Sequence, residues 1–194
     1  MKHFFTLFLI CVFFSSAKSQ SKKDLAVSLS AGVLNSPYYT NAHADHFYGA
    51  AFDYYLSDRS IISAGYFAGK HDYFDSILSN TTNYFLNNGS NSEAIYNTFT
   101  VQYKYKIINT SKFSLVPAVG LGMMTHTKRY PYEEGPTTYI RYSSWTDLVF
   151  PVNLDMNYSF SDHWQAGITS GLLIHPDYPV LALHIGPKLS YIIK

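Results

Sequence analysis

The sequence predicts an all-β protein: an eight-stranded antiparallel up-and-down barrel that spans a membrane, made after removal of a signal peptide. Three observations lead to this prediction: an apolar N-terminal segment, a period-two alternation of side chains, and three short polar turns at one spacing. The chain has 194 residues, a formal net charge of +1 and 14% charged residues, which suits one domain. With so few charges there is no basic stripe, so nucleic acid is not an expected partner.

Residues 1–20 have the organisation of a secretory signal peptide. A short basic start precedes an apolar run from Phe4 to Phe14, and Ala17-Lys18-Ser19 fits a small-x-small cleavage site. The run is shorter than the ~20 residues that a spanning helix needs. We therefore expect export and cleavage, with residues 21–194 forming the barrel domain; an uncleaved interfacial anchor is the alternative. Cys11, the only cysteine, lies in the removed part.

From Lys23 onward the side chains alternate in character, as in strands whose two faces meet different surroundings. Between Phe99 and Ile107, for example, every second residue is large and apolar and the others are polar. No further apolar stretch reaches the length of a spanning helix, so a membrane would have to be crossed by strands. The eight expected strands are Asp24–Leu34, Phe47–Leu56, Ile61–Tyr73, Ile95–Ile107, Phe113–Thr127, Thr146–Phe160, Trp164–His175 and Val180–Ile193.

The connections between these strands are of two kinds. Three are short polar turns that begin at Ser57, Asn109 and Ser161, each 52 positions after the one before. The others are Asn35–His46, Phe74–Ala94, Lys128–Ser144 and the shorter His175–Pro179, and all are polar or rich in tyrosine. Tight turns on one side and longer loops on the other are typical of outer-membrane barrels. We therefore expect both chain ends on the short-turn side.

The composition of the two strand faces favours lipid outside and a polar lumen inside. One face carries large apolar residues, whereas the other is mostly Gly, Ala, Ser and Thr, which suit the narrow interior of an eight-stranded barrel. A face exposed to water should instead carry many Lys and Glu. The alternative is a soluble, lipocalin-like cup with an apolar interior. An interfacial aromatic belt is expected at Tyr54, Tyr105, Tyr158, Trp164 and Tyr191.

Several segments resemble the small OmpA/OmpX-type outer-membrane β-barrel domains. The matching segments are Tyr55–Ile61 running on to Gly65, Val116–Gly122 and Tyr158–Trp164. The resemblance implies an eight-stranded, porin-like barrel in the outer membrane of a Gram-negative-type cell. It also implies that periplasmic chaperones and the outer-membrane barrel-insertion machinery are partners during biogenesis. The C-terminal run His184, Gly186, Leu189 and Tyr191 looks like the insertion signal, although the chain then ends in Ile-Ile-Lys instead of an aromatic residue.

Five charged residues on the polar face lie near the periplasmic strand ends and are expected to meet inside the lumen. Charges in a narrow lumen must pair or stay hydrated, because an isolated buried charge costs several kcal/mol. One interpretation is a packed network that plugs the lumen, and the alternative is a narrow gated path for ions or small solutes. The plug is favoured because eight-stranded barrels are filled by side chains. These residues are Asp53, Lys104, Lys106, Asp155 and Lys188.

The remaining candidates for chemistry are histidines. By the alternation His71, His126 and His184 face the lumen, and His175 lies near the outer rim. Metal-binding spacings such as HxH and HExxH do not occur, so interior hydrogen bonding is the expected role, with no metal and no cofactor. A lipid-modifying enzyme would need a His–Ser pair and an acid at the membrane face, which the sequence does not place together; no catalytic residue is expected.

The expected function is therefore that of an outer-membrane barrel with a structural or surface-interaction role and a plugged lumen. Its expected partner in the membrane is lipid, and a monomer is expected. The aromatic and polar loops Phe74–Ala94 and Lys128–Ser144 suit contact with a ligand or partner, since loops on a rigid scaffold often carry binding. A gated pore, a lipid-modifying enzyme and a soluble ligand binder remain the alternatives.

Overall fold

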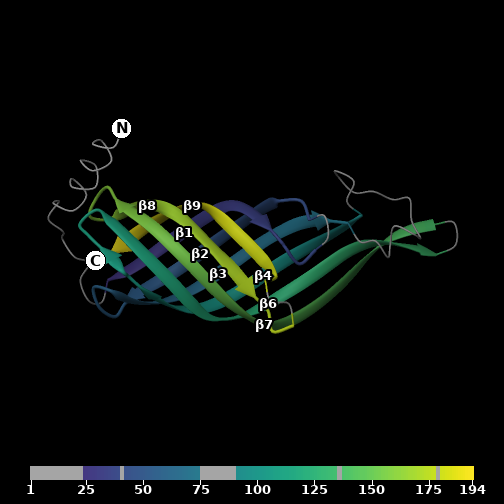
Figure 1. Ribbon diagram of the computed structural model, residues 1–194, viewed down its shortest axis with the longest axis horizontal. Coiled ribbons are helices and arrows are strands. Elements are labelled where there is room, and N and C mark those ends of the chain that lie inside the picture. Colours follow the sequence, from purple (N-terminus) through teal and green to yellow (C-terminus); the bar gives the residue numbers. More distant parts are fainter. Residues whose placement is uncertain (1–23, 40–41, 75–90, 135–136, 178–179) are drawn as a thin grey trace.

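The computed structural model describes residues 24–39, 42–74, 91–134, 137–177 and 180–194. The expected signal peptide (1–20) and most of the loop Phe74–Ala94 lie outside these residues. Within the described part no helix is long and apolar enough to cross a membrane. The strands, shown in Figure 1, are β1 (Leu25–Asn35), β2 (Asp45–Tyr55), β3 (Ser60–Tyr73), β4 (Ser92–Tyr105), β5 (Ile108–Asn109), β6 (Phe113–Glu134), β7 (Thr137–Ser159), β8 (Trp164–Ile174) and β9 (Ala182–Ile193).

The strands form one closed antiparallel barrel. Each strand pairs with its neighbours in sequence, β1 pairs with β9, and β4 pairs with β6 so that the ring has no break. The two-residue β5 continues β4 toward the turn. Counting β4 and β5 as one, the barrel has eight strands, which confirms the predicted fold class.

The stagger of the strands sets the width of the barrel. Following paired residues once around the ring from Leu25 leads back to the same strand at Asn35, ten residues further on. Eight strands with this stagger tilt by roughly 40° and enclose a cylinder of roughly 8 Å radius, measured to the backbone. A cylinder this narrow is filled by the side chains that point into it. The intermediate partners are Tyr54, Ile62, Tyr103, Val119, Val152, Leu172 and Leu183.

The two faces of the wall differ as the alternation predicts. Along β9 buried and exposed residues alternate without exception, from Ala182 to Ile193. The exposed positions of the barrel strands are mainly large and apolar, for instance Phe99, Leu121 and Ile185. The predicted belt residues also point outward at the short-turn end of the barrel: Tyr54, Tyr105, Tyr158, Trp164 and Tyr191. An apolar exterior of this kind needs a lipid environment.

The three equally spaced turns share one chemistry. The hydroxyl oxygen of Ser57 accepts hydrogen bonds from the backbone N–H groups of Arg59 and Ser60, at 3.3 and 3.0 Å. Ser161 does the same for His163 and Trp164, at 3.3 and 3.0 Å. In the middle turn Thr110 accepts from the N–H of Phe113 at 3.0 Å. Each hydroxyl satisfies N–H groups that the tight turn removes from the sheet.

The barrel closes between β1 and β9 at a pair of glycines. A Cβ on Gly186 would meet the carbonyl oxygen of Ala31, and one on Gly32 would meet that of Ile185. No residue pairs are formed between Ser30↔Lys188 and Val33↔Ile185, although the register is the same on both sides. Pro187, which offers no N–H, lies in this gap. Glycine on both strands therefore allows the two backbones to approach where the ladder is incomplete.

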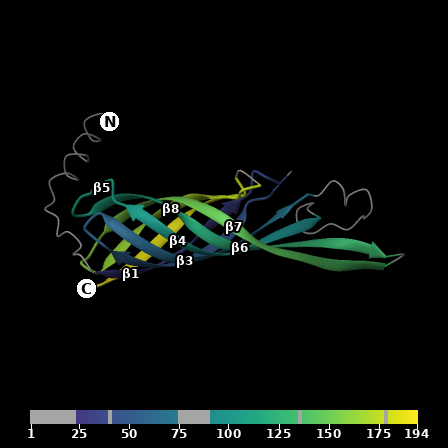
Figure 2. The ribbon, with the colours of Figure 1, turned by 90° about the horizontal axis from the view of Figure 1, so that it is seen from below.

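The connection expected as loop Lys128–Ser144 is mostly strand. β6 and β7 pair continuously from Gly122↔Val149 to Glu134↔Thr137, whereas β4 pairs with β6 only as far as Glu93↔Arg129. The end of this hairpin therefore stands beyond the other strands, as both views show (Figures 1 and 2). We call residues Tyr130–Glu134 of β6 and Thr137–Val149 of β7 the arm. The loop prediction was wrong because polar and tyrosine residues stand on both faces of Lys128–Ser144, so this segment lacks an apolar alternation.

Pro117 and Pro151 lie inside β6 and β7, where the missing N–H of proline would lead one to expect a bulge, but neither strand carries one there. The β6–β7 register is unchanged between Val119↔Val152 and Gly122↔Val149, and the pairs next to Pro151 are simply absent from the ladder. The extra residue lies on the other strand. The register of β4–β5 against β6 moves by one between Lys104↔Ala118 and Ile108↔Leu115, opposite Pro117, which is a β-bulge.

An arginine on the apolar exterior should destabilise the barrel in lipid, whereas one on the arm should not. Leu121 is 54% exposed in the middle of β6, and Tyr142 is 62% exposed on the arm. We expect Leu121→Arg to lower the free energy of unfolding in lipid vesicles by ~2–4 kcal/mol, the cost of arginine near the bilayer midplane. Tyr142→Arg is the matched control and should change it little. Equal, small effects in denaturant titrations would contradict a lipid-facing exterior.

Candidate functional site

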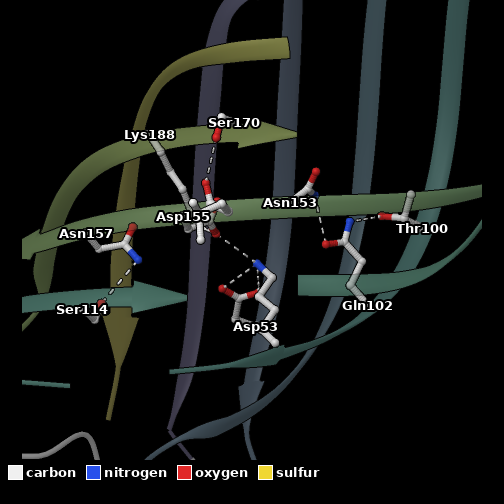
Figure 3. A network of polar contacts seen from close by, with 11 residues as sticks. Asp53, Thr100, Gln102, Ser114, Asn153, Asp155, Asn157, Ser170 and Lys188 are labelled. Carbon is white, nitrogen blue, oxygen red and sulfur yellow. Dashed lines mark hydrogen bonds and ion pairs between the residues drawn. The ribbon is translucent and has the colours of Figure 1, made fainter. Parts of the chain in front are cut away.

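Four of the five predicted lumen charges form one buried ionic layer. Lys104 Nζ lies 2.9 Å from Asp53 Oδ1 and 3.7 Å from Asp155 Oδ2, and Lys188 Nζ lies 2.5 Å from the same Asp155 oxygen. All four side chains are between 5 and 7% exposed. Figure 3 shows Asp53, Asp155 and Lys188 converging from different strands. The layer holds two cations and two anions, so it is neutral as a whole.

The barrel wall explains why these residues meet. Asp53, Lys104, Asp155 and Lys188 lie on β2, β4, β7 and β9, spaced around the ring and all on the inward side of the alternation. Because the radius is roughly 8 Å, long lysine side chains reach carboxylates on other strands. An unpaired charge in this narrow lumen would lose its hydration at a large cost in free energy. Ion pairing compensates that cost only if every partner stays in place.

Neutral polar groups extend the ionic layer around the lumen. Asn153 Nδ2 donates to Gln102 Oε1 at 3.0 Å, and Gln102 Nε2 donates to Thr100 Oγ1 at 3.2 Å (Figure 3). Beside them is a cavity of about 70 Å³, lined in part by Ser28, Ser63 and other small residues. A cavity of this size with polar walls can hold several water molecules. It is too small for a larger solute.

Lys106 does not join the ionic layer. Its Nζ lies over the ring of Tyr55, 4.7 Å from the centroid, and its backbone N–H donates to the Arg59 carbonyl at 2.8 Å. It belongs instead to the short-turn end of the lumen, where five buried residues form an apolar cluster. We call these the inner layer: Ala26, Tyr55, Ile61, Val116 and Ile192.

The opposite end of the lumen, toward the arm, is filled by a third, larger group that the sequence did not single out, which we call the outer layer. Tyr96 and Phe47 are its largest fully buried side chains, and Tyr39 of the β1–β2 connection packs against it. These residues stand on the face predicted to be small and polar, so that prediction holds only for the middle of the lumen. The outer layer consists of Leu34, Phe47, Tyr73, Ala94, Tyr96, Met124, Val149, Leu173, Leu181 and Ala182.

The three lumen histidines lie inside the barrel, with His71 and His126 packed against Tyr96 of the outer layer. His71 of β3 and His126 of β6 both stack on Tyr96 of β4, the strand between them, at ring-centroid distances of 5.4 and 4.9 Å. His184 lies further in, against Phe47 and Phe67. Among the described residues, no three His, Cys, Asp or Glu side chains are arranged to hold a metal ion.

The fourth histidine is held at the outer rim. His175 is 3% exposed; its Nε2 lies 3.3 Å from Asp147 Oδ2, and its Nδ1 accepts from the Asp177 backbone N–H at 3.1 Å. Both ring nitrogens thus have a neighbour. This contact ties the end of β8 to the base of the arm.

The residues of the C-terminal run occupy both faces of β9. His184 and Gly186 face the lumen, whereas Leu189 and Tyr191 face outward. Tyr191 packs edge-on against Trp164 at 4.9 Å, and the Ile192 N–H donates to the His163 carbonyl at 2.7 Å. In the folded protein the run is therefore the closing strand, with its aromatic residue on the exterior.

No family model matches the sequence. No curated protein matches it either. Solved structures do match: OprG from Pseudomonas aeruginosa (TM-score 0.62, 11% identity, 92% of this chain and 99% of that one) and Ail from Yersinia pestis, crystallised with the heparin analogue sucrose octasulfate (0.58, 8%, 89% and 99%). The N-terminal β-barrel domain of Pseudomonas aeruginosa OprF also matches (0.52, 12%, 90% and 100%). The chain thus has the fold of the small outer-membrane β-barrels, which confirms the resemblance.

Removing one charge from the ionic layer should lower the free energy of unfolding more than removing an oppositely charged pair does. Lys188→Met leaves Asp155 with only the more distant Lys104, and we expect a loss of ~3–5 kcal/mol in the free energy of unfolding. Adding Asp155→Asn restores neutrality, so the double variant should be less destabilised than the sum of the single ones. Denaturant titration of all three measures this, with exposed Lys112→Met as control. Additive losses would mean that the pair is not coupled.

Proposed function

We propose that this protein is an integral outer-membrane β-barrel with a closed lumen, acting through its structure and its external surface. The observation that carries the proposal is the lumen's filling: apolar layers at both ends and a neutral ionic layer between them. The apolar exterior supports the membrane location, and it argues against a soluble, lipocalin-like cup, which would keep its apolar residues inside.

The filled lumen argues against an open pore and weakens the gated-pore alternative. A gate made of the ionic layer alone would open when its pairs separate. Here a solute would also have to pass Tyr96 and Met124 on the outer side and Tyr55 and Ile61 on the inner side. Since the three layers lie in series, a change in any one of them leaves the other two closed.

The arm is the surface best suited to contact with a partner. Among the described residues its β7 side, from Thr137 to Val149, pairs only with β6, because β8 joins β7 only from Phe150↔Ile174 onward. The β6 side is shorter and carries Pro131, which offers no N–H. An unpaired strand edge can add a further strand from a partner. The exposed rings of Tyr132, Tyr139 and Tyr142 add contact area.

The lipid-modifying alternative has less support. An enzyme of this kind needs a histidine that is free to act as a base beside a nucleophile. His126 is 1% exposed, lies between rings, and shares a hydrogen bond with Tyr39. His175 has both nitrogens engaged. We therefore propose that the protein is not an enzyme.

The proposal includes the partners expected from the sequence. Lipid would surround the apolar exterior, and a monomer would suffice, because the barrel closes on itself. The exposed side of β9, with Leu189 and Tyr191, would be read by the insertion machinery before the strand pairs with β1.

Conductance across planar bilayers tests the closed lumen. We expect the wild type to be silent or nearly so, and Asp155→Ala to add at most rare, small openings because both apolar layers remain. Combining Asp155→Ala with Tyr96→Ala and Tyr55→Ala should raise conductance far more than any single change. Heat-dependent electrophoretic mobility would show that each variant still folds. Large, steady conductance in the wild type would make the protein a pore.

Labelling of single cysteines in intact cells tests the orientation. Glu134 lies at the end of the arm, and Asp58 lies in a turn at the opposite end of the barrel; both are exposed. A membrane-impermeant thiol reagent should label Glu134→Cys and spare Asp58→Cys until the cells are broken. The reverse labelling pattern would mean that the barrel has the opposite orientation. If neither cysteine were labelled in intact cells and the protein were recovered in the soluble periplasmic fraction, the barrel would not be a membrane protein.

A further inference from the structure

Within the described residues, Tyr39 and Ala42 of the β1–β2 connection pack against the outer layer from outside the barrel wall, and Tyr39 is the aromatic one. Tyr39 lies on Tyr73 at a centroid distance of 4.2 Å and against His71 at 5.1 Å. Its hydroxyl shares a hydrogen bond of 3.0 Å with His126 Nε2. Every one of these partners belongs to the buried interior of β3 or β6. Tyr39 therefore separates the stack of His71, Tyr96 and His126 from the outside.

The surroundings of the two histidines in this stack suit neutral imidazole rings. His71 is 0% and His126 1% exposed. Neither nitrogen of His71, nor Nδ1 of His126, has a hydrogen-bond partner among the described residues. A protonated imidazole donates through both nitrogens. With no acceptor in place, a charge here would cost several kcal/mol unless water could reach it.

The charged groups that face the two histidines come from several strands. His126 faces Lys128 on its own strand, and His71 and His175 on β3 and at the end of β8, all like-charged when protonated. The Lys128 ammonium lies over the rings of Tyr39 and Trp145, 5.4 Å from each centroid. His71 faces one carboxylate, Asp45 of β2, which is already paired with His46 and Lys70. Asp147 of β7 faces His175 instead.

We propose that the outer layer is an acid-sensitive closure, in which protonation of His71 and His126 displaces Tyr39 and admits water to the lumen as far as the ionic layer. Free histidine becomes charged near pH 6.5. Below that pH the displaced state gains up to about tenfold in population per pH unit for each proton it takes up. The ionic and inner layers themselves hold no histidine. His184 lines the cavity beside the ionic layer and faces Asp155, so a proton taken up there would sit beside a carboxylate, and we expect both layers to stay closed. This inference goes beyond the proposed function, since a sealed barrel does not require it.

Thr98 provides a direct test, because it is 0% exposed on the lumen face of β4, two residues from Tyr96. The protein would be the full chain with Cys11→Ala, purified from membranes. We would measure the rate at which a thiol reagent labels Thr98→Cys and divide it by the rate for Asp58→Cys. Asp58 is exposed, so this ratio cancels the pH dependence of thiol chemistry itself. The ratio should rise more than tenfold between about pH 7.5 and about pH 5. The same samples should remain silent in planar bilayers.

The matched control is His71→Phe with His126→Phe, which keeps the stacked rings but cannot take up a proton. In this background the ratio should not change with pH. A second readout is Trp145, whose ring meets His126 edge-on at 4.3 Å. In Trp164→Phe it is the only tryptophan, and its fluorescence should change over the same pH range. A labelling ratio that is constant in the wild type, or that rises equally in the phenylalanine variant, would overturn the proposal.

Discussion

The structure depends on one constraint: within the membrane, the backbone of each strand must find its hydrogen bonds in a ring that has no edges. In lipid an unpaired N–H or C=O costs several kcal/mol, so a sheet that crosses the membrane must close. With eight strands and a stagger of ten residues, closure leaves a cylinder of roughly 8 Å radius. The chemistry of the lumen follows from that width, because side chains from opposite strands meet there whether they are apolar, aromatic or charged.

Much of this was predictable from the residues alone. A period of two assigns each residue to a face, so Asp53, Lys104, Asp155 and Lys188 could be placed in the lumen together. The turns at Ser57, Thr110 and Ser161 could be found because a hydroxyl and a short polar stretch are local signals. The outward belt from Tyr54 to Tyr191 followed from the same alternation. These features depend on neighbours in sequence or on strand parity.

The other features of the lumen and the arm depend on contacts that the alternation of residues along a strand does not encode. Tyr96 and Phe47 also stand on the lumen face, but an average over that face hid their concentration at one end. The depth at which Tyr39 meets His126 depends on strand tilt and on the path of a connection, neither of which has a periodic signal. Lys106 was grouped with the other charges, although it lies one step nearer the turn, beside the bulge in β4–β5. The outer part of the arm was missed because polar and tyrosine residues on both of its faces leave no apolar alternation.

The pairing of β1 with β9 affects how such a chain can assemble. The three hairpins join residues close in sequence, and such contacts form quickly, but β1–β9 joins Leu25 to Ile193, nearly the full length of the described chain. Contacts of that range are slow to form. Until the last residues are present, any partly built sheet exposes two free edges that could pair with another molecule. A chain of this topology therefore gains from being kept unfolded until its synthesis is complete.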